Sequence, residues 1–446
     1  MSQPLEAFRN AWKIPELKQR IIFTLAMVAV YRFGAHVPTP GVDGAALSEA
    51  IGGSSGLLGF YDMFTGGAFE RATIFALGIM PYISASIIMQ LLVTVVPMLE
   101  RLQKEGAEGQ KKITEYTRYA TIALCIVQSL GMATFLQSMN GPNSQIVSNP
   151  GPWFYFMCVL SFTTGTAFIM WVGEQISERG VGNGISLIIF VSIVSMMPFA
   201  IMRTIDLIRV DELSIFMALM LLVLMVTVVA GVIIVTTGQR RVPVQYPRQI
   251  KGRKMTGGSG RSYLPLRVNQ AGVIPIIFAS SLLMLPGMIS QAISYSVIQN
   301  FFDVYFGPDS ILYALVYAAL IIFFCFFYTA ITFNPIEIAD NMKKYGGVIV
   351  GVRPGRATAD YLTKVMNRIT TVGSLFLAGV ALLPNFVFSV LNVSDMSIAS
   401  FFGGTSLLIL VGVALDTVKQ IEQHLIMRNY DGFMKGGGRM RARRGG

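Results

Sequence analysis

The chain has 446 residues, 53% of them hydrophobic and only 13% charged, and a formal net charge of +11. This composition excludes an ordinary soluble domain and is typical of a polytopic membrane protein. Three cysteines without a CxxC pair and two widely separated histidines argue against disulfides, zinc or other metals.

The N-terminal arm, residues 1–20, is basic and precedes an apolar run at 21–37. No small-residue cleavage site follows this run, so we predict an uncleaved first span. The stretch Gly52–Gly56 formally matches the G-x-S-x-G pattern of hydrolases, but no strand precedes it and only His36 could act as a base. We therefore predict no hydrolase activity.

The segment Leu57–Gly67 is apolar, interrupted by glycines, and shorter than the roughly 20 residues that cross a bilayer as a helix. It leads into a run without any ionisable group from Ala72 to Leu99. A half-helix that feeds a full span suggests a stopper in front of a passage.

Apolar runs of spanning length recur through the chain and predict ten transmembrane helices. They lie near residues 21–37, 73–96, 117–139, 153–173, 184–202, 213–236, 271–293, 311–333, 370–390 and 404–418.

Basic residues gather on one side of these spans. The arm, the loops after spans two, four, six and eight, and the C-terminal tail together hold 31 of the 35 Lys and Arg residues. By the positive-inside rule this side faces the cytoplasm, and we expect both termini there.

The interiors of the spans hold neutral polar residues, among them Gln90, Gln128, Asn183 and Asn269, and we expect no carboxylate at membrane depth. Ion-coupled carriers usually keep ionisable groups there. This pattern favours a passive passage driven by an external partner over a secondary transporter, which stays the alternative. A membrane scaffold without a passage would not need the half-helix.

Two cytoplasmic loops, residues 237–270 and 334–369, are long and basic. The first has no acidic residue, and VRPG in the second predicts a tight turn with Arg353 at its tip. Two interpretations are open: attraction to anionic lipid, or docking of a large anionic partner such as a ribosome. The residues concerned are Arg240, Arg241, Arg248, Lys251, Arg253, Lys254, Arg353 and Arg356.

Long motifs in a fixed order resemble the bacterial SecY family, from about Leu17 to Gln423. They include GGAFERATIFALGIMPYISASIIMQLL, EGAEGQKKITEYTRYAT, GEQISERGVGNGISLIIF, GQRRVPVQYPRQ, LPLRVNQAGVIPIIFASS, FFYTAITFNPIEIADNMKKYGG, GVRPGRATADYL and FGGTSLLILVGVALD. The basic C-terminal tail and the Gly52–Gly56 loop are less typical of the family.

The resemblance implies an all-α membrane protein with two pseudo-symmetric halves of five helices. The halves would be residues 21–202 and 213–418, joined by an external hinge at 203–212 and followed by a basic cytoplasmic tail at 419–446. The half-helix would be a plug at 57–67, with Leu57, Gly59, Phe60, Met63, Phe64, Gly66 and Gly67.

The resemblance also implies two sets of working residues. A pore ring would be formed by Ile79, Ile83, Ile185, Ile189, Ile277 and Ile409. A lateral gate would be formed by Ser84, Gln90, Gln128, Asn269 and Leu285.

The function implied is that of a protein-conducting channel, with no enzymatic activity and no cofactor. It would pass unfolded preproteins outward across the bacterial cytoplasmic (inner) membrane and release apolar segments, including signal sequences, sideways into lipid. The partners implied are SecE, SecG, the ATPase SecA and translating ribosomes.

Overall fold

The computed structural model describes residues 14–51, 57–140, 145–211, 213–246, 250–251, 254–255, 262–292, 310–391 and 404–436. The chain forms two compact units. The first contains Met1–Ser54, Phe60–Pro198 and Val413–Gly446, and the second contains Ser55–Gly59 and Phe199–Gly412. The predicted division into two five-helix halves is a different partition and stays a prediction.

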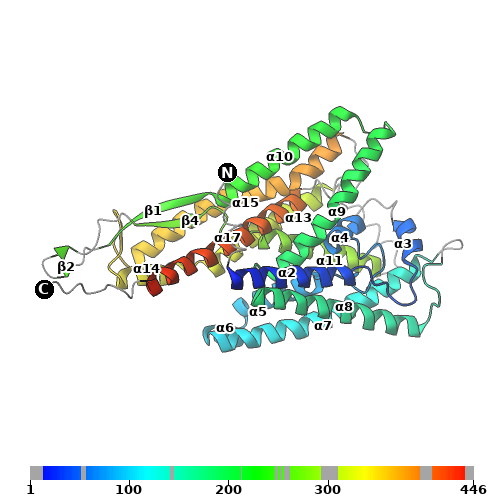
Figure 1. The fold of residues 1–446 in the computed structure, drawn as a ribbon, viewed down its shortest axis with the longest axis horizontal. Helices are drawn as coiled ribbons and strands as arrows, with labels where there is room; N and C mark the ends of the chain where they lie inside the picture. Colours follow the sequence, from blue (N-terminus) through cyan, green and yellow to red (C-terminus); the bar gives the residue numbers. More distant parts are fainter. Residues whose placement is uncertain are drawn as a thin grey trace, which may run out of the picture. The chain divides into compact units, whose positions relative to one another are not determined.

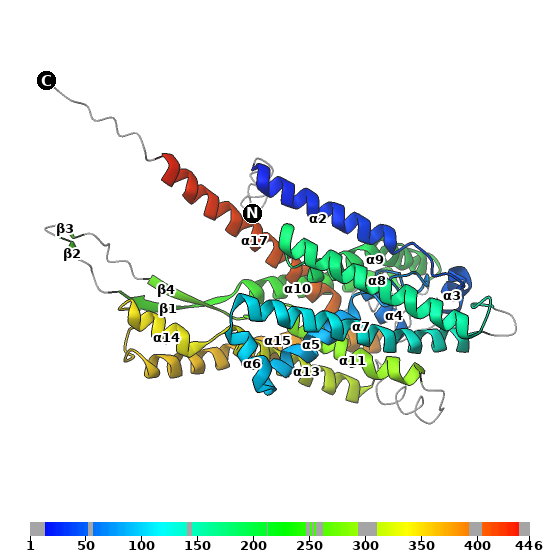
Figure 2. The ribbon, with the colours of Figure 1, turned by 90° about the horizontal axis from the view of Figure 1, so that it is seen from below.

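The first unit is built from long helices that pack along one another. Helices α2, α8 and α7 run side by side, with α5 packed against α7 (Figures 1 and 2). Helix α9 begins in this unit and ends in the second, whereas α17 begins in the second and ends here. The helices are α2 (Pro15–Gly34), α3 (Gly44–Ile51), α4 (Leu57–Thr65), α5 (Met80–Val95), α6 (Pro97–Lys104), α7 (Ala107–Ser138), α8 (Pro152–Arg179), α9 (Gly184–Arg209) and α17 (Gly404–Gly436).

The second predicted span, 73–96, is only partly helical, so that prediction is wrong at its start. Residues before Met80 form turns, with Gly78 at φ +56°. Helix α5 begins there with a proline in its first turn and ends at Val95. The next residue, Val96, is extended because proline follows it. Beyond this break, α6 turns away by 96°.

Two glycines let the non-helical segment pass close to α2 and α8. A Cβ atom on Gly165 would lie 2.0 Å from the carbonyl oxygen of Ile74, and one on Gly34 would lie 2.2 Å from the ring of Phe75. The segment before α5 is therefore fixed by contacts that only glycine permits.

We expect Gly165→Ala to destabilise the protein by about 1–3 kcal/mol, because the added methyl group meets backbone that cannot rotate away. Thermal unfolding of the purified protein in detergent measures the effect. Gly379→Ala is the matched control: it lies on a helix with nothing within 4 Å of an added Cβ, and it should be neutral or slightly stabilising. Equal stability of the two variants would show that α8 can shift without cost.

The second unit combines long helices with a small antiparallel sheet in the order β4-β1-β5. Val244 of β1 pairs with Ser262 of β4 and with Ile349 of β5. The elements are α10 (Ile215–Thr237), β1 (Gln239–Gln245), β2 (Ile250–Lys251), β3 (Lys254–Met255), β4 (Ser262–Arg267), α11 (Ile274–Ala292), α13 (Ile311–Thr332), α14 (Pro335–Lys344), β5 (Val348–Ile349) and α15 (Arg356–Leu391).

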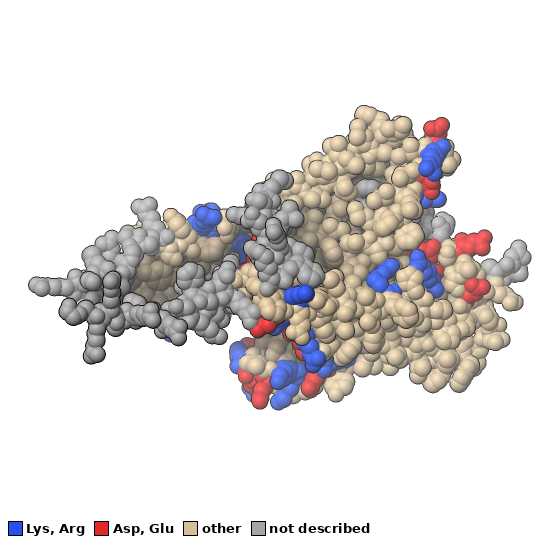
Figure 3. Space-filling model, in the orientation of Figure 1, with Lys and Arg blue, Asp and Glu red and all other residues tan. Residues whose placement is uncertain are grey.

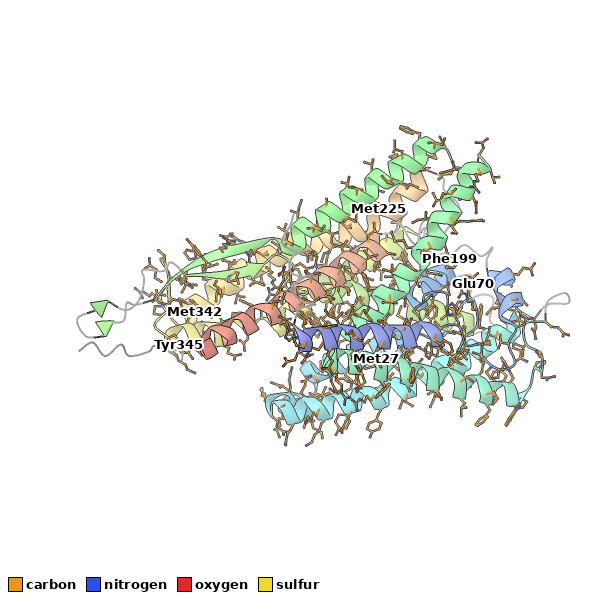
Figure 4. All side chains as sticks on the ribbon, viewed as in Figure 1. Met27, Glu70, Phe199, Met225, Met342 and Tyr345 are labelled. Carbon is orange, nitrogen blue, oxygen red and sulfur yellow. The ribbon has the colours of Figure 1, made fainter. Side chains whose placement is uncertain are left out.

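The sheet covers a hydrophobic cluster of its own, which the sequence analysis did not foresee. Val242 and Val244 of β1 are buried and Pro243 between them is exposed, as expected for a strand with one buried face. Met342 on α14 belongs to this cluster and Tyr345 follows the helix (Figure 4). The basic region 237–270 is therefore in part an ordered hairpin.

Among the described residues, seven helices are long and apolar enough to cross a membrane, or eight if the bent pair α5 and α6 is one span. Figure 3 shows charged side chains gathered over α6 and the start of α7, and an uncharged surface at the lower right, over the other end of α7 and the start of α8. The chain is a multi-pass membrane protein, and the count of ten spans stays a prediction.

Candidate functional site

Helix α4 coincides with the predicted plug and is buried. Tyr61, Met63 and Phe64 are each less than 5% exposed. The hydroxyl of Tyr61 donates to the carbonyl of Leu77 at 3.0 Å, and its ring packs edge-on against Phe69. Gly59 is half-buried, and the side chains of Leu57 and Phe60 lie outside the described residues. The contacts that the structure describes for this helix come from its second half.

The C-terminal end of α4 is hydrogen-bonded to α2. The Tyr31 hydroxyl lies 3.4 Å from the carbonyl oxygen of Thr65 and 2.7 Å from the hydroxyl of Ser192 on α9. Arg32 donates to the carbonyl of Gly66 at 3.1 Å. A cation at the C-terminal end of a helix also stabilises the helix dipole.

Gly66 and Gly67 end the helix in the left-handed region, with φ values of +69° and +82°. A Cβ atom on Gly66 would lie 3.0 Å from the Cα atom of Ser192. Both conformation and space therefore favour glycine at Gly66.

Asp62 is a buried carboxyl group in α4 that the sequence analysis missed. It accepts hydrogen bonds from the backbone N–H of Glu70 at 2.9 Å and from the Thr65 hydroxyl at 3.4 Å. Burial, partly offset by the Glu70 N–H, raises the pKa of this carboxyl group to about 6. The only signal in the sequence is one acid within an otherwise apolar half-helix.

Four of the predicted pore residues lie in the first unit. Ile79 precedes α5, and its carbonyl accepts from the N–H of Ile83 at 3.1 Å. Both side chains are buried, as is Ile189, whereas Ile185 is half-buried. Asn183, expected inside a span, instead caps α9: its Oδ1 accepts from the N–H of Ile185 at 3.1 Å.

The other two predicted pore residues lie in the second unit. Ile277 on α11 and Ile409 on α17 are 4% and 0% exposed. A ring made of all six residues would join both units and stays a prediction.

The predicted gate residues are also divided between the units. Ser84 on α5 is buried, and Gln90 on the same helix donates to Ser86 at 3.2 Å. Gln128 on α7 has a buried Oε1 atom without a hydrogen-bond partner among the described residues. Asn269 donates to the carbonyl of Gly272 at 2.9 Å, which closes the turn before α11. Leu285 lies on α11, and the structure does not describe its side chain.

The predicted docking residues that the structure describes are exposed. Arg240 and Arg241 lie on β1. Arg353 lies in the turn before α15, and Arg356 begins that helix. Lys251 and Lys254 lie on β2 and β3 with undescribed side chains, and Arg248 and Arg253 lie outside the described residues.

Arg118 and Glu174 form an ion pair between α7 and α8, two candidate spans. Helix α8 continues past residue 173, the predicted end of span four, and carries Glu174 in this continuation, so the absence of a carboxylate at membrane depth stays a prediction. Within the described residues, no cluster of His, Cys, Asp or Glu could hold a metal ion.

The comparisons with known proteins agree with this architecture. The family model SecY matches residues 73–418. The protein translocase subunit SecY of Streptomyces griseus is 48% identical over 441 residues, covering 96% of this chain and 99% of its own. The SecY of Escherichia coli K12 is 46% identical over 424 residues and 94% of each chain.

Solved structures show the same fold at low sequence identity. A structure described as that of a protein conducting channel has a TM-score of 0.66 at 18% identity, covering 93% of this chain and 96% of its own. Sec61 in the canine ribosome-channel complex has a TM-score of 0.63 at 16% identity, with the same coverage. The family match and the two bacterial relatives show that this chain belongs to the SecY family.

Proposed function

We propose that this chain is the pore subunit of a translocon, through which unfolded preproteins cross the membrane and from which apolar segments leave sideways into lipid. The observation that carries the proposal is 48% identity to a SecY translocase subunit along nearly the whole chain. The chain is accordingly a protein-conducting channel and not an enzyme. The relatives give no support to the secondary transporter.

The closed state would be maintained by an apolar constriction with the plug α4 beside it. A narrow ring of isoleucines excludes ions because water in it loses hydrogen bonds without finding polar partners. In the first unit, Ile83 in the first turn of α5 and Ile189 in the second turn of α9 are buried. The Tyr31 hydroxyl of α2 links Thr65 of α4 to Ser192 of α9.

The lateral gate would depend on weak polar contacts. Gln90 bonds within its own helix, and the carbonyl oxygen of Gln128 has no hydrogen-bond partner in the part of the chain that the structure describes. Hydrogen bonds between membrane helices contribute only about 0.6 kcal/mol on average. An apolar signal sequence could therefore displace them.

The partners would bind on the basic cytoplasmic side. Arg240 and Arg241 stand on an ordered hairpin, and Arg353 stands on an exposed turn, so both surfaces are held in shape before binding. Ribosomal RNA is the anionic partner that this charge fits, with anionic lipid as a second source of phosphate. We further propose SecE, SecG and SecA as partners in the bacterial inner membrane.

Both termini are proposed to lie in the cytoplasm. In a cysteine-free background, Arg353→Cys should react with an impermeant thiol reagent only from the cytoplasmic side. Glu49→Cys, on the exposed helix α3 after the first span, should react only from outside. The reverse labelling pattern would remove the argument for docking on Arg353.

The proposed function is tested in liposomes that contain the chain with SecE, SecG and an anionic phospholipid. With SecA and ATP added outside, a radiolabelled preprotein should become resistant to protease. Resistance must disappear without ATP and after detergent is added. A preprotein that stays fully digestible in the presence of all components would overturn the proposal.

A further inference from the structure

The ion pair between Arg118 and Glu174 joins two different helices through two parallel contacts. The Nε atom of Arg118 donates to Oε1 of Glu174 at 2.9 Å, and Nη2 lies 2.8 Å from Oε2. The Glu174 side chain is 14% exposed. This bidentate geometry fixes the relative orientation of the two side chains as well as the distance between them.

The pair differs from two ion pairs that lie within single helices of the described residues. Lys104 pairs with Glu100 and Arg209 with Asp206, each within one helix turn and with exposed side chains. Such exposed pairs contribute little to stability. Arg118 is 42% exposed, but Glu174 lies mostly out of solvent between two candidate spans, where a carboxylate is costly once its partner is removed.

Two further observations place the pair near the helices that carry the predicted pore residues. Tyr82, on the first turn of α5 and next to Ile83, interacts electrostatically with both charged groups. Glu174 follows Gly173, where an added Cβ would lie 3.3 Å from Ile185 of α9.

The beginning of α9 is also bound closely to α8 around this point. The N–H of Gly184 donates to the hydroxyl of Ser177 at 2.9 Å, and that hydroxyl donates to the carbonyl of Gly173 at the same distance. A Cβ on Gly184 would lie 1.9 Å from that carbonyl oxygen. A shift of α8 at Glu174 would therefore move α9 with it.

We propose that the Arg118–Glu174 pair is a positioning element of the pore: it fixes α7 to α8 and thereby holds the first turns of α5 and α9 in place. This inference rests on the proposed function, since it gives the pair a role only if Ile83 and Ile185 line a passage. Neither residue needs to contact the translocating chain.

The test compares Arg118→Glu, Glu174→Arg and the double variant that exchanges the two charges. Ion conductance of the resting channel is recorded in planar bilayers. Each single variant should raise it about tenfold, the change that a weakening of the closed state by about 1.4 kcal/mol gives. The double variant should return it close to the parent value. Lys104→Glu, which breaks the exposed pair with Glu100, is the matched control and should leave conductance unchanged.

If the single charge reversals do not fold, Arg118→Lys and Tyr82→Phe keep the test open. Lysine keeps the positive charge but cannot make the two parallel contacts of the guanidinium group, and phenylalanine lacks only the hydroxyl of tyrosine. Each variant should raise the resting conductance less than the charge reversals do. Folded variants as tight as the parent would overturn the inference, as would a charge exchange that rescues nothing. Failure of the parent to translocate protein in liposomes would instead overturn the proposed function.

Discussion

Replacing Ile83, Ile189 and Ile409 together with serine is expected to raise the resting ion conductance by at least about tenfold, which corresponds to about 1.4 kcal/mol. All three side chains are buried, and their branched apolar surfaces would keep a narrow pore dry. Hydroxyl groups would supply the hydrogen-bond partners that a water column needs. Single serine variants at any of the six positions should have smaller effects. Planar-bilayer recording measures the conductance, and protein export should continue.

The matched control for the ring is an isoleucine on an exposed helix face. Ile234 on α10 is 69% exposed, so Ile234→Ser should leave the conductance unchanged. The triple variant is also recorded after deletion of α4, since the plug could conceal a leak. A triple variant that stays as tight as the parent in this background would show that the isoleucines are ordinary packing residues.

The long helices could be predicted from the sequence because apolar length alone determines whether a segment spans a bilayer. The start of α5 could not be predicted in this way. Residues 73–79 are as apolar as a helix interior, but they form turns between α2 and α8, where Gly34 and Gly165 leave room for them. Hydropathy cannot distinguish these two environments.

The basic hairpin was overlooked for a related reason. Only Val242 and Val244 alternate with exposed residues on β1, and their cluster includes Met342 and Leu362 from α14 and α15. A pattern this short predicts nothing until its distant partners are known. The charges of the region, in contrast, could be read directly from the sequence.

Buried polar groups were the other class that the sequence did not reveal. Asp62 is a single acid within an apolar half-helix and Glu174 a single acid just past a predicted span, and their partners are 3 to 56 residues away. Tyr31 and Ser192 are 161 residues apart. Contacts of this kind depend on the packing of helices, which local sequence does not specify.

The carboxyl group of Asp62 should make the docking of α4 depend on pH. Its pKa is about 6 in the docked helix and 3.8 as the ordinary value, so docking is strongest below pH 3.8, where the group is protonated in both states. This advantage is lost as the pH rises from 3.8 to about 6. The difference between the two pKa values corresponds to about 3 kcal/mol of docking free energy. The nearby Glu70 contributes by repelling the ionised form.

We therefore expect Asp62→Asn to hold α4 more tightly than the parent near neutral pH and to remove the pH dependence. The parent channel should leak less on acidification through about pH 6, whereas the leak of the variant should be low and constant across that range. Planar-bilayer recording at a series of pH values measures both. Asp43→Asn is the matched control, because that exposed carboxylate caps α3 and asparagine caps a helix equally well; it should behave like the parent. If Asp62→Asn leaks as the parent does at every pH, the carboxyl group does not control the position of α4, and its burial has only a structural role.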